Sequence, residues 1–137
     1  MSFQYSTTVR NAALDAVESA VGTAPRLYLY TGAIPANCAT AASGTLLNAT
    51  TYTLPSDWMA AASGGSKSLA GSPWGLAGSA AGTAGYFRIL DNAGSTVHIQ
   101  GTVTTTGGGG DMILDNTSIA VNQIINITTF TLNIGGA

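Results

Sequence analysis

Residues 86–103 read YFRILDNAGSTVHIQGTV, two runs rich in strand-forming residues on either side of Asp91-Asn92-Ala93-Gly94. β-Branched and aromatic side chains favour an extended backbone, so Tyr86–Leu90 and Ser95–Val103 are expected to be strands. Asp and Asn side chains form local hydrogen bonds to the backbone of a turn, and Gly94 supplies the positive φ that a tight turn requires. This stretch therefore predicts two strands joined by a four-residue turn.

The rest of the C-terminal half continues as short strands separated by turns. Gly107–Gly110 is expected to form a hairpin tip before a strand at Met112–Leu114, and another turn precedes a strand at Ser118–Val121. From residue 125 to residue 134 apolar side chains occupy both alternating sets of positions, which is typical of a strand covered on both faces. Seven to eight strands with regularly spaced turns indicate a mainly β fold, a β-sandwich or jelly roll, with one N-terminal α-helix.

That helix is expected from Ser6 to Gly22. Ser6, Thr7 or Thr8 can accept a hydrogen bond as the N-cap, and Gly22 followed by Pro25 is typical of a helix end. The charged residues of the segment fall mostly outside the stripe that is expected to pack on the sheet. That stripe consists of small apolar residues at helical spacing: Val9, Ala13, Ala16, Val17, Ala20 and Val21.

The segment between the helix and residue 86 has weaker signals. Arg26–Tyr30 alternates leucine with tyrosine and predicts a strand, followed by a loop at 33–44 and a second strand at 45–54. Pro55-Ser56-Asp57 resembles a helix start, so residues 58–62 are expected to form one or two helical turns. Residues 63–85 are rich in Gly, Ala and Ser, but the two large apolar residues at 74 and 76 favour ordered loops and thin strands over a linker. A single domain, 1–137, with an N-terminal arm at 1–5 is the expected organisation.

Charge is scarce in this chain: four basic and six acidic residues among 137, or 7 %, where a soluble domain carries about a quarter. The four basic residues are dispersed, which argues against direct nucleic-acid binding. No apolar run reaches the ~20 residues of a membrane span, and the first residues resemble no secretory signal. Cys38 is the only cysteine, so stability must come from packing, and folding in a reducing cytoplasm is expected.

The candidate chemical sites are weak. Gly107–Gly110 leads into Asp111, which would repel phosphate, and the Gly-Gly-Ser-Lys run at 64–67 does not open an apolar helix. His98 with Cys38 could form a zinc or nucleophilic pair, but nothing in the sequence places them together. Asp111 and Asp115 have no calcium-loop spacing and are expected to be solvated turn residues. The sequence predicts no catalytic, cofactor or metal residues, and hence a protein that is not an enzyme.

Aromatic residues remain as candidates for binding. Trp and Tyr fill cores and protein interfaces, where one end of the side chain is apolar and the other polar, whereas exposed rings could stack on sugars in a glycan-binding module. Phe3 and Tyr5 precede the helix and are candidates for an arm that reaches onto a partner. The predicted interface residues are Phe3, Tyr5, Trp58 and Trp74.

Several segments resemble a family of small virion structural proteins of tailed bacteriophages. The segments are Thr8–Asp15 with Tyr30–Ala33, Leu54–Trp58, Gly82–Ile89 and Gly109–Asp111, and the similarity runs over nearly the whole chain. The resemblance implies a capsid decoration or cement protein with a jelly-roll or sandwich fold, bound to the outside of an HK97-like shell after assembly in the host cytoplasm. The implied partner is the major capsid protein, with a homodimer or homotrimer as the natural form. The resemblance assigns a functional role to no individual residue. A tail or neck component and a glycan-binding surface module remain the alternatives.

Overall fold

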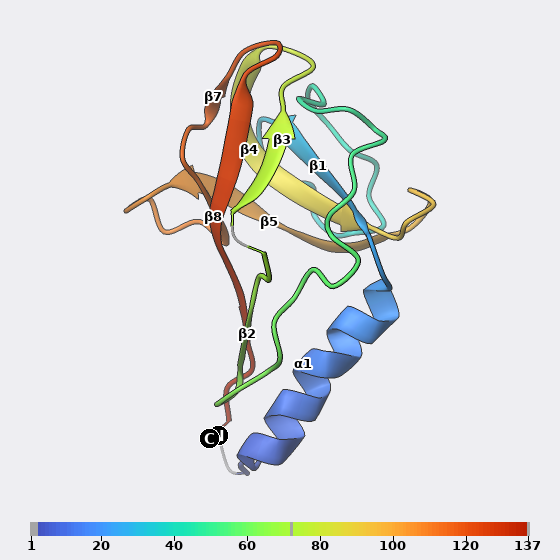
Figure 1. Ribbon diagram of the computed structural model, residues 1–137, viewed down its shortest axis with the longest axis vertical. Helices are drawn as coiled ribbons and strands as arrows, with labels where there is room; N and C mark the ends of the chain where they lie inside the picture. The colour runs from blue at the N-terminus through green and yellow to red at the C-terminus, as the bar shows by residue number, and fades with distance from the viewer. Residues whose placement is uncertain (1–2, 72, 137) are drawn as a thin grey trace.

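The computed structural model describes residues 3–71 and 73–136. Met1 and Ser2 of the expected arm, Ser72 and Ala137 lie outside these ranges. The described residues form one helix and eight strands (Figure 1): α1 (Thr7–Val21), β1 (Arg26–Thr31), β2 (Ser66–Ser68), β3 (Trp74–Ala77), β4 (Gly82–Leu90), β5 (Val97–Thr105), β6 (Met112–Leu114), β7 (Ser118–Ile119) and β8 (Ile124–Asn133). The prediction of a mainly β fold with an N-terminal helix is confirmed.

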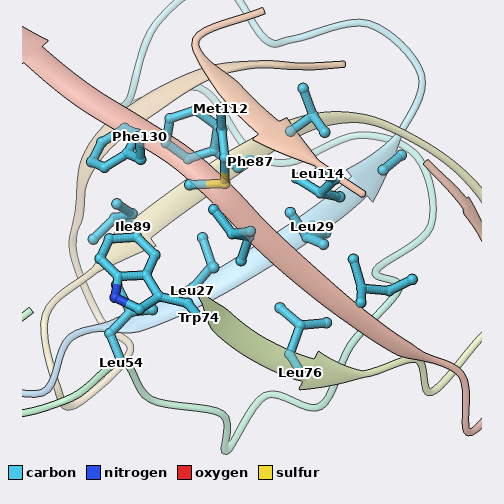
Figure 2. Close-up of a cluster of buried hydrophobic side chains, with 14 of the residues drawn as sticks. Leu27, Leu29, Leu54, Trp74, Leu76, Phe87, Ile89, Met112, Leu114 and Phe130 are labelled. Carbon is cyan, nitrogen blue, oxygen red and sulfur yellow. The ribbon is translucent and has the colours of Figure 1, made fainter. Parts of the chain in front are cut away.

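The strands form one mixed sheet in the order β1-β4-β5-β6-β8-β2, with β3 added to β8 and β7 added to β4. The sheet folds over, so that β8 crosses in front of β1 and β4 with the core side chains between them, as in a sandwich (Figure 2). The antiparallel pair β4–β5 contains the predicted turn, where Gly94 has φ 73° and the Asp91 carboxylate accepts a hydrogen bond from the Ser95 N–H at 2.7 Å. The local signal in residues 86–103 therefore predicted this part of the sheet correctly.

Four aromatic rings form the centre of the core. Trp58 and Trp74 lie with their ring centroids 6.3 Å apart, Phe130 lies 5.8 Å from Trp74, and Phe87 meets Phe130 edge-on at 5.5 Å. Aliphatic side chains from β1, β3, β4, β6 and β8 surround them (Figure 2). Each such side chain contributes about 1.5–3 kcal/mol when it is fully buried.

The glycine run Gly107–Gly110 is not a hairpin tip. It returns the chain so that β6 lies parallel to β5, with Val103 opposite Met112. A Cβ at Gly108 would lie 2.6 Å from Thr104 Cβ, and a Cβ at Gly110 would lie 2.8 Å from Thr104 N. The return crosses directly over Thr104, so only glycine fits there. The Asp111 carboxylate closes the return by accepting hydrogen bonds from the N–H and hydroxyl of Thr102 at 2.8 and 2.9 Å.

The mixed apolar pattern of β8 has a different cause from the one expected. Ile125, Ile127 and Phe130 are buried, whereas Thr128 and Thr129 are exposed. Against β6, Leu114 pairs with Ile127 and Ile113 with Thr129, so the register shifts by one residue at Thr128. A bulge of this kind moves the inward-facing set of residues by one position. The prediction of two covered faces is therefore wrong.

Residues 45–54 form no regular strand, although a strand was expected there. They touch β1 through isolated bridges at Leu46 and Thr53. Between these bridges, the side chain of Asn48 is buried, accepts a hydrogen bond from the Leu29 N–H and donates one to the Leu27 carbonyl, both at 2.8 Å. One side-chain amide thus takes the place of a strand residue along this part of β1.

Residues 58–62 are not helical, although one or two helical turns were expected there. The Ala60 N–H donates to the Ser68 carbonyl and the Ala70 N–H to the Trp58 carbonyl, so this segment pairs with residues 68–70. The pairing places Trp58 and Met59 in the core. The free energy of burying these two side chains outweighs the helix propensity of the alanines that follow.

The helix has the predicted bounds. The Ser6 hydroxyl accepts a hydrogen bond from the Val9 N–H at 3.3 Å, and Gly22 ends the helix with φ 92°. Its orientation differs from the prediction, because Val9, Ala13, Ala16 and Ala20 of the expected inner stripe are exposed. The residues of α1 that are buried are Leu14 and Val21.

Candidate interaction surface

The charged side chains of α1 bond to other parts of the chain. Its carboxylates Asp15 and Glu18 accept hydrogen bonds from the Lys67 ammonium of β2 at 2.7 and 2.8 Å. Lys67 is only 3 % exposed. Burial alone lowers the pKa of Lys67, but the hydrogen bonds and charges of the two carboxylates outweigh it and raise that pKa above its usual 10.5. The hydrogen bond to Lys67 likewise lowers the pKa of Asp15.

The first half of α1 holds the hairpin tip at residues 63–66 in the same way. The Asn11 side-chain oxygen accepts a hydrogen bond from the Gly65 N–H at 2.9 Å. The Arg10 guanidinium donates to the carbonyls of Gly64 and Ile134, both at 3.4 Å. The tip and β2 present backbone groups and an ammonium to the helix, so polar side chains of α1 reach this part of the chain beside the buried Leu14 and Val21.

The outer face of α1 is left apolar and without charge. Val9 is 50 % exposed, and Ala12, Ala13, Ala16 and Ala20 are exposed along the rest of the helix. At its N-terminal end a groove of about 320 Å³ lies between Tyr5, Val9, Ala13, Arg10 and Ile134. We call the exposed side chains Phe3, Tyr5, Val9, Ala13, Ala16 and Ala20 the outer surface of α1.

The predicted arm residues belong to this surface. Phe3 is 59 % and Tyr5 43 % exposed, and their rings meet edge-on with centroids 5.6 Å apart. The Tyr5 N–H donates to the Gly136 carbonyl at 2.6 Å, which fixes the arm to the C-terminal segment. Two large aromatic side chains are thereby held outward beside an apolar groove. Their role at an interface stays a prediction.

Trp58 and Trp74 contradict the prediction that they are interface residues. They are 0 % and 2 % exposed. The Trp58 indole N–H donates a hydrogen bond to the Gly22 carbonyl at 3.0 Å, and the Trp74 indole N–H donates one to the Ala70 carbonyl at 2.8 Å. Since buried rings cannot stack on a sugar, the glycan-binding alternative loses the two residues on which it depended.

The candidate chemical residues are spread over the molecule. His98 is exposed on β5, Cys38 lies on the 33–44 loop, and no hydrogen bond among the described residues joins them. Asp111 holds the glycine-rich return, and Asp115 accepts hydrogen bonds from the backbone and side-chain N–H groups of Asn126 at 3.0 Å. No cluster of three metal-ligating side chains occurs within 3–71 and 73–136.

Lys67 is the site residue that the sequence analysis missed. Its glycine-rich neighbourhood indicates a hairpin tip and gives no sign of burial. The feature of the sequence that could have indicated a buried cation is the spacing of Asp15 and Glu18, because residues three apart lie on one side of a helix and can bind the same cation. The partner, however, lies 52 residues from Asp15 in sequence.

A comparison with protein-family models found no matching family, and comparisons with curated proteins and with solved structures found no significant match. In the part of the chain that is described, no helix combines the length and hydropathy needed to cross a membrane.

Proposed function

We propose that this chain is a non-enzymatic virion structural protein, a capsid cement protein that binds the outside of a tailed-phage shell and bridges its major capsid subunits. The resemblance in the sequence supports the class of protein. The outer surface of α1 supports binding as its mode of action. A tail or neck component is the alternative within the same class.

One observation carries this proposal. The charged side chains of α1 bond to residues 64–67 and to Ile134. The exposed stripe that remains on the helix is apolar and uncharged, and two exposed aromatic rings lie beside it; the stripe consists of Val9, Ala13, Ala16 and Ala20. A helix that served only the fold would bury this apolar face. An exposed apolar face beside aromatic residues is typical of a surface that a partner covers.

The composition suits repeated contacts on a shell. An uncharged surface of Ala, Thr, Ser and Asn can be covered by a partner without the cost of desolvating ions. Many copies on one shell, or a dimer or trimer at a symmetry axis, would make modest affinity at each contact effective.

The first experiment is to count copies of this chain in purified virions by quantitative mass spectrometry against the major capsid protein. We expect a copy number of the same order as that of the shell subunit. A handful of copies per particle would move the protein to the neck or tail. Absence from the virion would overturn the proposal.

A matched pair of variants tests the surface. Val9 and Val121 are similarly exposed, at 50 % and 56 %, but Val121 follows β7 at the far end of the molecule (Figure 1). We expect Val9→Asp to abolish saturable binding to shells stripped of this protein and Val121→Asp to leave it intact. Asp near a helix N-terminus is favourable, so Val9→Asp should fold normally. Loss of binding in Val121→Asp alone would exclude the outer surface of α1.

A further inference from the structure

A second buried cation donates its hydrogen bonds to a loop rather than to α1 or β2. Arg88 of β4 is 3 % exposed and lies beneath the 33–44 loop. Its Nη2 donates to the Thr40 carbonyl at 2.7 Å and to the Asn37 carbonyl at 3.5 Å. Its Nε is buried and has no hydrogen-bond partner. A buried guanidinium with an unused donor is costly, because it has lost its water shell without full replacement.

No carboxylate compensates this charge. Within residues 3–71 and 73–136 the ion pairs are the two of Lys67. The cross-strand neighbours of Arg88 are Tyr28 on β1 and Gln100 on β5, and the Gln100 amide nitrogen donates to the Pro35 carbonyl at 2.8 Å. Gln100 is neutral, and its side-chain oxygen is also buried without a partner. Arg88 is therefore surrounded by oxygen dipoles and lacks a counter-charge.

Arg88 lines a hollow of about 460 Å³ between the loop residues 38–41 and residues 95–97, which lead into β5. One anionic group lies at its edge: Asp91 accepts hydrogen bonds from the N–H and hydroxyl of Ser95, both at 2.7 Å, and from the Thr96 N–H at 3.2 Å. This carboxylate would repel a doubly charged phosphate more strongly than a singly charged group. The planar fork of a guanidinium matches the two oxygens of a carboxylate.

We propose that this hollow, which we call the Arg88 pocket, binds a single carboxylate group that pairs with Arg88. The volume of the pocket exceeds that of a bare ion, so it admits either a small free carboxylate or an acidic side chain on an extended peptide. Both sources offer the same chemistry to Arg88. The proposal does not depend on binding to a shell.

The test is a titration of the full-length chain followed by ¹H–¹⁵N NMR, which reports the Arg88 Nε–H group directly. The probes are sodium acetate and acetyl-Gly-Asp-Gly-amide, compared with sodium chloride at equal ionic strength and with the Asn version of the peptide. We expect a saturable shift of the Arg88 Nε–H and Thr40 amide signals with acetate or the Asp peptide. A response to acetate indicates that a free carboxylate suffices. A response to the Asp peptide alone indicates that a polypeptide delivers the group.

The control is a second arginine with similar bonding. Arg26 donates to the carbonyls of Asn92 and Thr50, both at 2.7 Å, but is only half-buried. We expect Arg88→Met to weaken the response of the Thr40 amide signal about tenfold or more, since charged hydrogen bonds are lost, and Arg26→Met to leave it unchanged. If Arg88→Met does not fold, the titration of the natural chain decides alone. No saturable shift with either probe, or equal shifts with chloride, would overturn the proposal.

Discussion

Lys67 and Arg88 are equally buried, at 3 % exposure, but the groups that surround their charges differ. Lys67 is held by two carboxylates at 2.7 and 2.8 Å, whereas Arg88 is held by two backbone carbonyls at 2.7 and 3.5 Å. The helix supplies acidic side chains to the first cation, and an uncharged loop supplies only peptide oxygens to the second.

The difference follows from the chemistry of the two cations. An ammonium is a compact and strongly hydrated charge, so its burial requires full anionic compensation. A guanidinium spreads its charge over a plane and is more weakly hydrated, so carbonyl oxygens can replace part of its hydration. Lys67 thus joins α1 to β2, while Arg88 keeps binding capacity that the chain itself does not use.

The largest expected effect comes from removing both anions that hold Lys67. Asp15→Asn with Glu18→Gln leaves the ammonium buried without a counter-charge, so we expect Tm to fall by about 10 °C in thermal unfolding followed by circular dichroism. Adding Lys67→Met to this variant should restore most of the loss. Asp57→Asn, at an exposed acidic residue outside the pair, is the control. A Tm unchanged in the double variant would show that the ion pairs of Lys67 with Asp15 and Glu18 do not stabilise the packing of the helix.

Acid should break the Asp15–Lys67 ion pair, with a smaller effect on Tm than the double substitution. The pKa of Asp15 is lowered below its usual 3.8 by Lys67, so its contribution to stability is complete above that pH and is lost as the pH falls through the lowered value. The raised pKa of Lys67 keeps its contribution present below pH 10.5, and it is lost only as the pH rises through the raised value.

We therefore expect Tm to drop by several degrees between about pH 4 and pH 2, and less so in Asp15→Asn. Asp91 also has a lowered pKa, caused mainly by its hydrogen bonds from Ser95, so some acid sensitivity should remain in that variant. Identical pH profiles for Asp15→Asn and the natural chain would contradict the assignment to this pair.

The smallest effect is expected at the other cation. Arg88→Met removes a buried charge, and the carbonyls of Asn37 and Thr40 lie on exposed loop residues where water can replace the lost donors. We expect Tm to change by less than about 3 °C in either direction. A fall as large as that of the Asp15/Glu18 double variant would remove the contrast between the two sites.

The sequence predicted those features whose signals are local. Ser6 and Gly22 mark the ends of α1, and Gly94 marks the turn between β4 and β5, because caps and turns depend on neighbouring residues. The parallel return at Gly107–Gly110 and the orientation of α1 were mispredicted. Both depend on contacts with distant groups, such as the bond between Asp15 and Lys67 across 52 residues. Of the outer surface of α1, Phe3 and Tyr5 were predicted, but its helical residues were not, because a periodic pattern does not say which face is covered.

Asn48 has a consequence for how this chain avoids aggregation. Exposed edges of β-sheets recruit strands from other molecules, and proteins usually prevent this with charged side chains. With ten charged residues in all, this chain has few to place there. The Asn48 side-chain amide forms hydrogen bonds with the Leu29 N–H and the Leu27 carbonyl, and the Leu47 N–H donates to the Leu29 carbonyl. These backbone groups of β1 are therefore not available to a strand from another molecule. Covering this edge by hydrogen bonds serves in place of electrostatic repulsion and leaves association to side-chain surfaces.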